Sequence, residues 1–509
     1  MKRILAGLVC GAMVVSVAFA IADTPEVLKE LNESLPAGLE KCGVPSLAVG
    51  VIRDGKVIFN RAYGWSDLKK RTAATPDTIY RIGSCSKAFA AAALGVLVDR
   101  GALKWTDRVR DHLPEFRLRD AYVTEHATIE DLLTHRVGFK AYDGDLLWYR
   151  TGYNAREILT RIGRLPLSHG FREAKGYSNI MYLVAQRIVE RISGVPYRDF
   201  VQRNLFKPMG MRDASLTFAR VADKAEFARP YKRNKELVPE PLDAIPAAGG
   251  VNASMNDMLK WVGMLLAGGK SGDNQVLSET VVNSFFVPRM INPIGGLEQY
   301  MGLKFSLYGL GWNLYPYHNR KVVVHQGALP GYIANVLLVP EEKLGVVVMC
   351  NELTMLSFGV SRKILDLLLG VEGKKWIADA PRFDQWLAAQ EKAGARQLDA
   401  LRRPDTHPSL ALDEYCGRYA DPYYGHAKVS LRQGRLHLSL EPTRGKLAGD
   451  LEHHHLNSFR VDFKDPYIPA GLVTFHLDAD GKISGFSFRI RANDFNFENL
   501  RFTKQSPAQ

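Results

Sequence analysis

The first hundred residues change from a strand-like to a helix-like pattern of hydrophobic positions. Two runs rich in β-branched residues make up Ser46–Gly64, and the Asp54-Gly55 pair between them is a typical two-residue turn. This segment therefore predicts a β-hairpin. Ser84–Arg100 contains many alanines, no proline and a single glycine, which predicts a helix.

Helical spacing dominates the middle of the chain, and strand patterns return later. Apolar residues recur at helical spacing in Ile129–Leu133 and Ile180–Ile192. The later strand-like runs are Gly309–Leu314, Val322–Val324, Ile333–Val339 and Gly345–Met349, with a turn at Pro340–Lys343 and a helix at about Val360–Leu369. Strands at both ends with helices between them predict an α/β (α+β) domain. Its single antiparallel sheet is flanked by helices and closed by both ends of the region, with an all-helical subdomain inserted.

The C-terminal part of the chain has a third pattern. Phe383–Arg403 is charged and helical, and Arg403–Pro408 has the composition of a linker. Beyond it, apolar and polar residues alternate in Val429–Leu440 and Leu472–Ile490, each interrupted by a glycine turn. We therefore expect a leader at 1–22, a large domain at 23–380, a helical linker at 381–410 and a small all-β barrel at 411–509.

The N-terminus has the pattern of a secretory signal. Lys2 and Arg3 are followed by an uncharged, apolar stretch that ends in small residues before Asp23, with A-x-A sites at Ala18–Ala20 and Ala20–Ala22. We expect a cleaved signal peptide and a periplasmic or secreted protein. The alternative is an uncleaved membrane anchor formed by residues 4–22, which is just long enough to span a bilayer.

Composition and charge exclude several classes of protein. With 46% hydrophobic and 24% charged residues among 509, the chain is neither disordered nor a polytopic membrane protein. The formal charge of +13 is scattered rather than gathered in blocks with aromatic residues, which argues against nucleic-acid binding and favours peripheral association with an anionic cell envelope. Glycine and Cys/His spacings match no nucleotide or zinc site, so we expect no cofactor and no metal.

Ser84 and Lys87 form an S-x-x-K pattern at the start of a predicted helix. Three residues apart, the two side chains share one helix face, so a neutral lysine can accept the proton of the serine hydroxyl. Burial lowers a lysine pKa, which is the required direction. A helix-capping serine beside a solvated lysine is the alternative interpretation. Ser66–Lys69 fits the same pattern, but its basic neighbours predict an exposed turn.

Two further patterns can bring polar groups to such a nucleophile. Tyr177-x-Asn179 stands at a predicted loop-to-helix junction, whereas Tyr317–Asn319, which also fits, stands in a predicted hairpin loop. His325-x-Gly327 follows an apolar strand, and its glycine leaves room for a substrate along the strand edge. Taken singly, each has a plain structural interpretation: a tyrosine packed at a helix start, and a surface histidine at a strand end.

In this order, the three patterns resemble the motifs of the serine β-lactamase and penicillin-binding-protein superfamily. The class C branch is the most similar, with its esterase, D-aminopeptidase and carboxypeptidase-like relatives. Four more segments are similar to that branch: Leu132–Gly138, Pro246–Val251, Tyr308–Trp312 and Gly331-Tyr332. The resemblance covers about residues 25–375, and residues 411–509 look like the lipocalin-like barrel appended to some of these hydrolases.

The resemblance implies a role for each motif residue. Ser84 would be the acylated nucleophile, Lys87 its activator, and Tyr177 the group that passes the proton to and from the leaving group. The backbone N–H groups of Ser84 and Ala328 would form the oxyanion hole, and Asn179 would bind the substrate amide.

One departure from the family's pattern concerns the third motif. His325 stands where β-lactamases usually have lysine, and with Gly327 it would line the substrate site. A mostly neutral imidazole holds a carboxylate less firmly than an ammonium does. We therefore expect an exported serine hydrolase that cleaves amide or ester bonds of a small molecule or peptide through Ser84, favouring short or D-residue-containing peptides. The alternatives are a carboxylesterase or weak β-lactamase, and a penicillin-binding sensor that is acylated without turnover.

Two other groups have ambiguous patterns. His453–His455 resembles a metal-binding tract, but successive strand residues point to opposite faces, which favours a structural or surface role. Four residues between the first two motifs fit two interpretations equally well, lining the rim of the cleft or ordinary loop capping: Tyr142, Asp143, Asp145 and Trp148.

Overall fold

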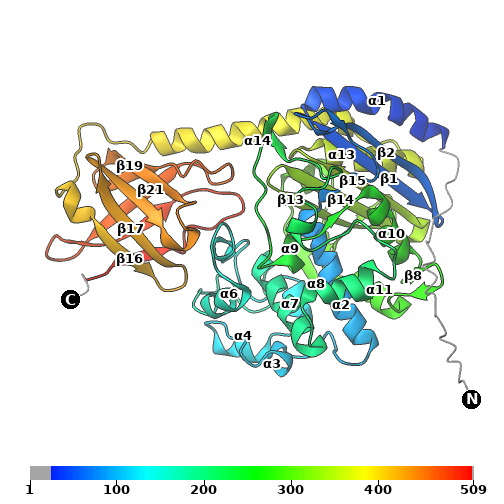
Figure 1. Ribbon diagram of the computed structural model, residues 1–509, viewed down its shortest axis with the longest axis horizontal. Helices are drawn as coiled ribbons and strands as arrows, with labels where there is room; N and C mark the ends of the chain where they lie inside the picture. Colours follow the sequence, from blue (N-terminus) through cyan, green and yellow to red (C-terminus); the bar gives the residue numbers. More distant parts are fainter. Residues whose placement is uncertain (1–24, 507–509) are drawn as a thin grey trace, which may run out of the picture.

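The computed structural model describes residues 25–506, which form two bodies joined by a long helix (Figure 1). That helix, α14 (Trp376–Asp399), runs along the larger N-terminal body toward the C-terminal barrel. The predicted leader at 1–22 lies outside the described residues. Over residues 25–506, the chain has no helix with the length and apolar character needed to cross a membrane.

The larger body is organised by a nine-stranded antiparallel sheet. Its strands, in spatial order, are β10 (Met290–Asn292), β11 (Ser306–Tyr308), β12 (Asn313–Tyr317), β13 (Arg320–Leu329), β14 (Tyr332–Val339), β15 (Leu344–Cys350), β1 (Ser46–Arg53), β2 (Lys56–Asp67) and β3 (Thr72–Ala73). β1 pairs with β15 from Leu47 opposite Cys350 to Arg53 opposite Leu344. The predicted sheet, closed by both ends of the region, is confirmed.

The β1–β2 hairpin has the predicted turn. Asp54 and Gly55 have φ values of 49° and 73°, and two successive positive φ values match the right-handed twist of the flanking strands. Both faces of the sheet are covered. Ala48 and Ile52 of β1 belong to one hydrophobic cluster, and Leu47, Val49 and Val51 belong to the cluster on the opposite face. Burial on both faces explains why this strand is almost continuously apolar.

One predicted strand is wrong. Gly309–Trp312 is a turn between β11 and β12, closed by a hydrogen bond from the Gly309 amide to the Trp312 carbonyl at 2.8 Å, and only Asn313 and Leu314 of the predicted run belong to a strand. A β-carbon at Gly309 would lie 2.2 Å from the Phe285 carbonyl oxygen, so the glycine permits a close approach that no regular strand makes. Leu310 and Trp312 are buried in the core, which gives this turn the apolar pattern of a strand.

The sheet is packed between two helical layers. α10 (Met255–Leu266) contacts β1 and β15 on one face, while α1 (Glu26–Cys42), α13 (Leu356–Leu369) and α14 cover the other (Figure 1). The inserted helical part includes α2 (Ser86–Asp99), α5 (Ile129–Leu133), α6 (Ala155–Ile162) and α7 (Asn179–Ser193). α5 and α7 confirm the helices predicted at Ile129–Leu133 and Ile180–Ile192.

α2 is the central helix of the molecule. All its residues from Ser86 to Leu97 are buried, as expected for a helix that is apolar all round. It begins two residues later than the sequence predicts, because Gly83–Cys85 form a separate 3₁₀ turn. Ser84 therefore lies in this turn, just before the helix.

The C-terminal domain is a closed eight-stranded barrel, which confirms the predicted small barrel. Its strands are β16 (Gly417–Asp421), β17 (Gly425–Arg432), β18 (Arg435–Leu440), β19 (Ala448–His455), β20 (Ser458–Val461), β21 (Gly471–Leu477), β22 (Ile483–Arg489) and β23 (Arg501–Lys504). His453–His455 end β19, and His454 is buried between two partly exposed neighbours. Within residues 25–506, no group of three or more His, Cys, Asp or Glu side chains has the arrangement of a metal site.

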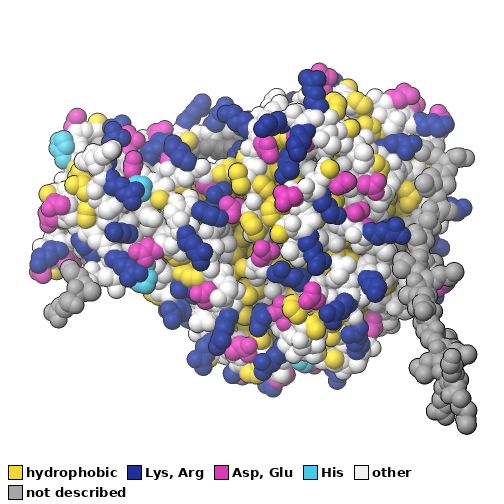
Figure 2. Space-filling model, in the orientation of Figure 1, with side chains coloured by type: hydrophobic (Ala, Val, Ile, Leu, Met, Phe, Trp, Pro, Cys, Tyr) yellow, Lys and Arg dark blue, Asp and Glu magenta, His cyan; other side chains and the backbone are white. Residues whose placement is uncertain are grey.

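Charged residues are mixed over the surface. Figure 2 shows Lys and Arg side chains interleaved with Asp and Glu over both bodies, without a continuous basic stripe on that face. This distribution agrees with the scattered charge of the sequence.

Helix–sheet packing at β15 generates a stability prediction. A β-carbon at Gly345 would lie 2.2 Å from Val262 Cγ1 of α10. Gly345→Val should therefore destabilise the larger domain by about 1–3 kcal/mol through overpacking. Thermal unfolding followed by circular dichroism measures this. Gly296→Val adds the same side chain where nothing lies within 4 Å, so an equal loss in this control would contradict the explanation.

Candidate active site

Ser84 lies at the centre of the molecule, in the turn between β4 (Tyr80–Arg81) and α2. The turn requires Gly83, whose φ is 51° and whose β-carbon would lie 2.9 Å from the Ala328 backbone nitrogen. Such a close approach excludes a side chain at this position. The turn thus presses the backbone beside Ser84 against β13, while the Ser84 side chain stays partly exposed.

Lys87 is completely buried one helical turn after Ser84. Its Nζ lies 3.0 Å from Ser84 Oγ, 2.6 Å from Asn179 Oδ1 and 2.9 Å from the Ala248 carbonyl oxygen. Burial lowers the pKa of Lys87 to about 7, although the nearby Asp145 acts in the opposite direction. A neutral amine has two N–H donors and one lone pair. With both donors directed at the carbonyl-type oxygens, the lone pair faces the Ser84 hydroxyl.

Tyr177 and Asn179 come from the start of α7, as their motif predicts. Ser178 is the N-cap between them, and its hydroxyl accepts a hydrogen bond from the Met181 amide. The Tyr177 ring centre lies 4.7 Å from Lys87 Nζ, and its hydroxyl shares a hydrogen bond with Ser84. Burial raises the pKa of Tyr177 well above its usual value. The neutral phenol can therefore give one proton and take another, but it is no phenolate base.

The two competing motif matches lie elsewhere. Ser66 is buried in β2 and donates to the Thr72 carbonyl, so the predicted exposed turn is wrong for this residue and right only for Lys69. Tyr317 is on β12, where its hydroxyl donates to Asp366 in the cluster on the opposite face of the sheet. Tertiary context thus leaves one match of each motif beside Ser84.

Gly327 brings β13 against the serine turn. A β-carbon there would lie 1.8 Å from the Ile82 carbonyl oxygen and 2.8 Å from the Ser84 backbone nitrogen. Only glycine fits between these backbone atoms. The next residue, Ala328, is exposed, so its amide and that of Ser84 belong to adjoining segments at an accessible edge.

His325 is placed differently from its expected position in the substrate site. Its ring is 2% exposed, with Nε2 3.1 Å from the Tyr308 hydroxyl and Nδ1 2.7 Å from the Gln326 carbonyl oxygen. Burial lowers the pKa of His325 to about 3. The ring is therefore neutral and points into the protein, where it has polar partners of its own.

A buried chain of hydrogen bonds links this histidine to the start of α7. The Ser178 amide donates to His135 Nδ1 at 3.0 Å, so the proton of neutral His135 is on Nε2, 3.3 Å from the Tyr308 hydroxyl. Tyr308 then donates to His325 Nε2, and His325 donates from Nδ1 to the Gln326 carbonyl. Each donor in this chain of hydrogen bonds therefore has an acceptor, with both histidines and the tyrosine neutral. The chain ties β13 to the residue between Tyr177 and Asn179.

Two buried ionisable groups near the site have no motif of their own. Asp145 is in a 3₁₀ turn (Asp145–Leu147), and its Oδ2 accepts from Asn179 Nδ2 at 2.5 Å; burial raises its pKa to about 8. Lys175 donates to Asn292 Oδ1 at 2.7 Å and lies 4.0 Å from the Tyr308 ring centre; burial lowers its pKa to about 7. Only the closeness of Lys175 to Tyr177 in sequence could have indicated its position.

The sequence of the chain matches two known families. Residues 30–370 match the Beta-lactamase family, and residues 401–504 match a domain of unknown function, DUF3471. The chain belongs to the Beta-lactamase family. This confirms the resemblance carried by the three motifs and makes the protein a β-lactamase-family serine hydrolase.

Curated relatives of this β-lactamase-family protein include hydrolases, and a solved structure shares its fold. The chain is 29% identical to the unguisins hydrolase ungD′ of Aspergillus campestris over 78% of this chain and 76% of that protein. It is 25% identical to the unguisins hydrolase ungD of Aspergillus violaceofuscus, over 81% and 79%. The octameric penicillin-binding protein homologue from Pyrococcus abyssi shares the fold, with a TM-score of 0.59 and 22% identity over 94% of this chain and 100% of that one.

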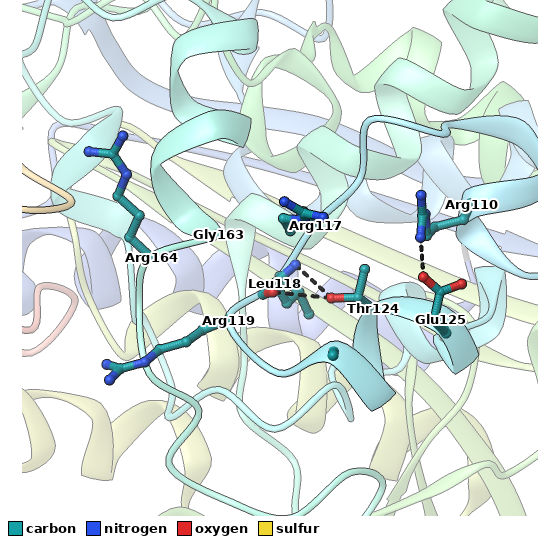
Figure 3. Close-up of a pocket in the computed structure, with 9 residues that line it drawn as sticks. Arg110, Arg117, Leu118, Arg119, Thr124, Glu125, Gly163 and Arg164 are labelled. Carbon is teal, nitrogen blue, oxygen red and sulfur yellow. Dashed lines mark hydrogen bonds and ion pairs between the residues drawn. The ribbon is translucent and has the colours of Figure 1, made fainter.

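A separate cavity of about 530 Å³ lies in the helical part of this β-lactamase-family protein (Figure 3). Four arginines contribute to its lining: Arg110, Arg117, Arg119 and Arg164. Arg110 is paired with Glu125. The lining includes none of Ser84, Lys87, Tyr177 and Asn179, which we call the Ser84 cluster. This cavity therefore does not belong to the candidate active site.

The buried histidine–tyrosine chain generates a prediction for this β-lactamase-family fold. Tyr308→Phe removes the hydroxyl that serves both His135 and His325, and should cost about 1–3 kcal/mol because two buried ring nitrogens lose their partner. Chemical or thermal unfolding checks the loss. Tyr300→Phe, which removes a less buried hydroxyl that donates to Asp379, is the matched control and should cost less. Equal losses in both variants would refute the assignment.

Proposed function

We propose that the protein is an exported serine hydrolase that cleaves amide or ester bonds through a Ser84 acyl-enzyme, with short peptides, including those with D-residues, as preferred substrates. The observation that carries the proposal is the contact between the buried Lys87 amine and Ser84 Oγ at 3.0 Å. Export follows from the predicted leader at 1–22, and association with the cell envelope from the basic, mixed surface.

Acylation begins with a proton transfer from Ser84 to Lys87. As the proton moves to Nζ, the Ser84 oxygen forms a bond to the substrate carbonyl carbon, and the carbonyl electron pair moves onto its oxygen. The amides of Ser84 and Ala328 then stabilise this oxyanion. As the oxyanion re-forms the carbonyl, the bond to the leaving group breaks, and Tyr177 donates its phenolic proton to the departing amine or alkoxide and is reprotonated from Lys87. Water then attacks the acyl carbon in the same way, with the Ser84 oxygen as leaving group. This releases the acid and restores Ser84.

The end of β13 supports a peptide-like substrate, because β12 pairs with β13 only from Arg320 to Val324 and Ala328 beyond it is exposed. An extended peptide can lie along a strand edge and pair with backbone groups such as those near Ala328. Asn179 contributes a side-chain amide beside the nucleophile. The names of the two fungal relatives describe hydrolases and are compatible with this class of reaction.

Carboxylesterase activity is the second candidate, because of the burial of His325. A neutral ring directed at Tyr308 supplies no positive charge for a terminal carboxylate. The same fact lowers the expectation of strong β-lactam hydrolysis. A penicillin-binding sensor would use the same nucleophile and differ only in failing to release the acyl group.

Replacement of the nucleophile tests the proposal. Ser84→Ala should abolish labelling by a fluorophosphonate probe and reduce turnover of an ester and D-amino-acid peptide panel by on the order of 10³-fold or more. Ser66→Ala removes the serine of the competing motif and should change neither. Labelling that persists in Ser84→Ala would contradict the proposal. A wild-type protein that is labelled once and releases no product would identify the sensor instead.

The lowered pKa of Lys87 predicts the pH dependence. Only the neutral amine accepts the Ser84 proton, so kcat/KM should rise with pH and reach half its plateau near pH 7, where the amine loses its proton. Lys87→Arg remains protonated throughout this range and should be inactive. A pH profile from about pH 5 to about pH 9 measures this, with Lys69→Arg as control. A flat wild-type profile would disprove the role of the lysine.

A further inference from the structure

The segment from Lys140 to Arg150 lies between the Ser84 cluster and the C-terminal barrel. On its inner side, Asp145 Oδ2 accepts a hydrogen bond from Asn179 Nδ2, and Asn179 Oδ1 accepts one from Lys87 Nζ. The two contacts hold both ends of the amide, with its NH₂ group at Asp145 and its oxygen at the lysine. Asp145 thus orients a group that holds Lys87.

On its outer side, the same segment is held by the barrel. Asp143 is fully buried, and its Oδ1 accepts from Asn496 Nδ2 at 2.6 Å and from Asn499 Nδ2 at 2.9 Å. Both asparagines belong to the loop between β22 and β23. Two donors from a different domain therefore converge on one carboxylate oxygen two residues from Asp145.

A second set of barrel contacts holds the other end of the segment. The Phe495 ring lies 4.3 Å from the Tyr149 ring, and the Tyr149 hydroxyl donates to Asp465 at 3.1 Å. Arg150 forms an ion pair with the same Asp465, whose side chain is 1% exposed. Buried, charge-assisted contacts of this kind are much stronger than surface ion pairs. Barrel groups thus flank Asp145 on both sides along the chain.

We propose that the C-terminal barrel positions the active site: its loops hold Asp143 and Tyr149, which fixes Asp145 and, through Asn179, sets the Lys87 amine against Ser84. Asn496, Asn499 and Asp143 are positioning residues in this scheme. The proposal rests on the proposed Ser84 chemistry for its catalytic consequence, while the mechanical link from the barrel to Asn179 stands independently of it.

The ionisation of Lys87 provides a readout that a merely stabilising domain would not move. The titratable groups that face the lysine or Asp145 come from several elements. They are Cys85, His135, Tyr142, Tyr177, Tyr182, His325 and, from the barrel, Asp494. The Asp145 carboxylate raises the pKa of Lys87. If the segment shifts, this contribution changes, and the midpoint of the pH profile moves with it.

The test uses the full-length chain with Asn496→Leu and Asn499→Leu combined, which removes both donors to Asp143. We expect kcat for an activated ester to fall roughly 10- to 100-fold, because a small displacement far from the chemistry is enough to misalign a base, with a smaller change in KM and a shifted pH midpoint. The matched control combines Arg161→Ala and Arg164→Ala. It also removes two hydrogen bonds between the domains, to the Tyr423 and Pro422 carbonyls, but neither touches the segment.

Hydrogen exchange separates this proposal from the proposed function. Amide exchange near Asp145 and at the start of α7 should become faster in the asparagine variant than in the arginine control, whether or not the protein turns over any substrate. Asp143→Leu alone should reproduce the faster exchange. Combining it with the two asparagine substitutions should add nothing further. Unchanged exchange, or equal effects in variant and control, would overturn the positioning role. Faster exchange in a protein without Ser84 turnover would support the link and reject the proposed chemistry.

Discussion

The burial of one amine, that of Lys87, depends on how the rest of this structure is arranged. Lys87 can activate Ser84 only as a neutral base, and its pKa is brought down to about 7 by desolvation rather than by a neighbouring positive charge. Such burial requires a helix with no solvent-facing side at this position. α2 meets that requirement, because the helical subdomain and the sheet enclose it from Ser86 to Leu97. The inserted helices therefore contribute to the burial on which the proposed chemistry depends.

The same constraint explains which groups surround the amine. A carboxylate in direct contact would restore the charged form and raise the pKa of Lys87. Its contacts are instead a hydroxyl, a backbone carbonyl and the Asn179 amide oxygen, while Asp145 lies one hydrogen bond further away. Asn179 lies between the Asp145 carboxyl group and the Lys87 amine. Asp145 can therefore orient the Asn179 amide that contacts the amine without touching the amine itself. Burial raises the pKa of Asp145, so neither group is strongly held in its charged form.

Sequence patterns predicted the parts of the site that depend on local spacing. Ser84 and Lys87 are three residues apart across the start of α2, and Tyr177 and Asn179 flank a helix N-cap, so both pairs are recognisable from the chain alone. The position of His325 depends on Tyr308 and His135, which reach it from other elements. Asp145 acquires its partner only when α7 packs beside it. Gly309–Trp312 misled the prediction because a buried turn has the apolar content of a strand.

The charge balance around Tyr177 has consequences for recognition. Three basic side chains lie around it, Lys87, Lys175 and His135, and burial lowers the pKa of each. Above about pH 7 this part of the site carries little positive charge. An anionic substrate group would lose its hydration on entering the site, and little positive charge there would compensate for that loss. A substrate held by amide and backbone hydrogen bonds avoids that cost. The neutral histidine in the third motif therefore agrees with the proposed preference for peptides or esters.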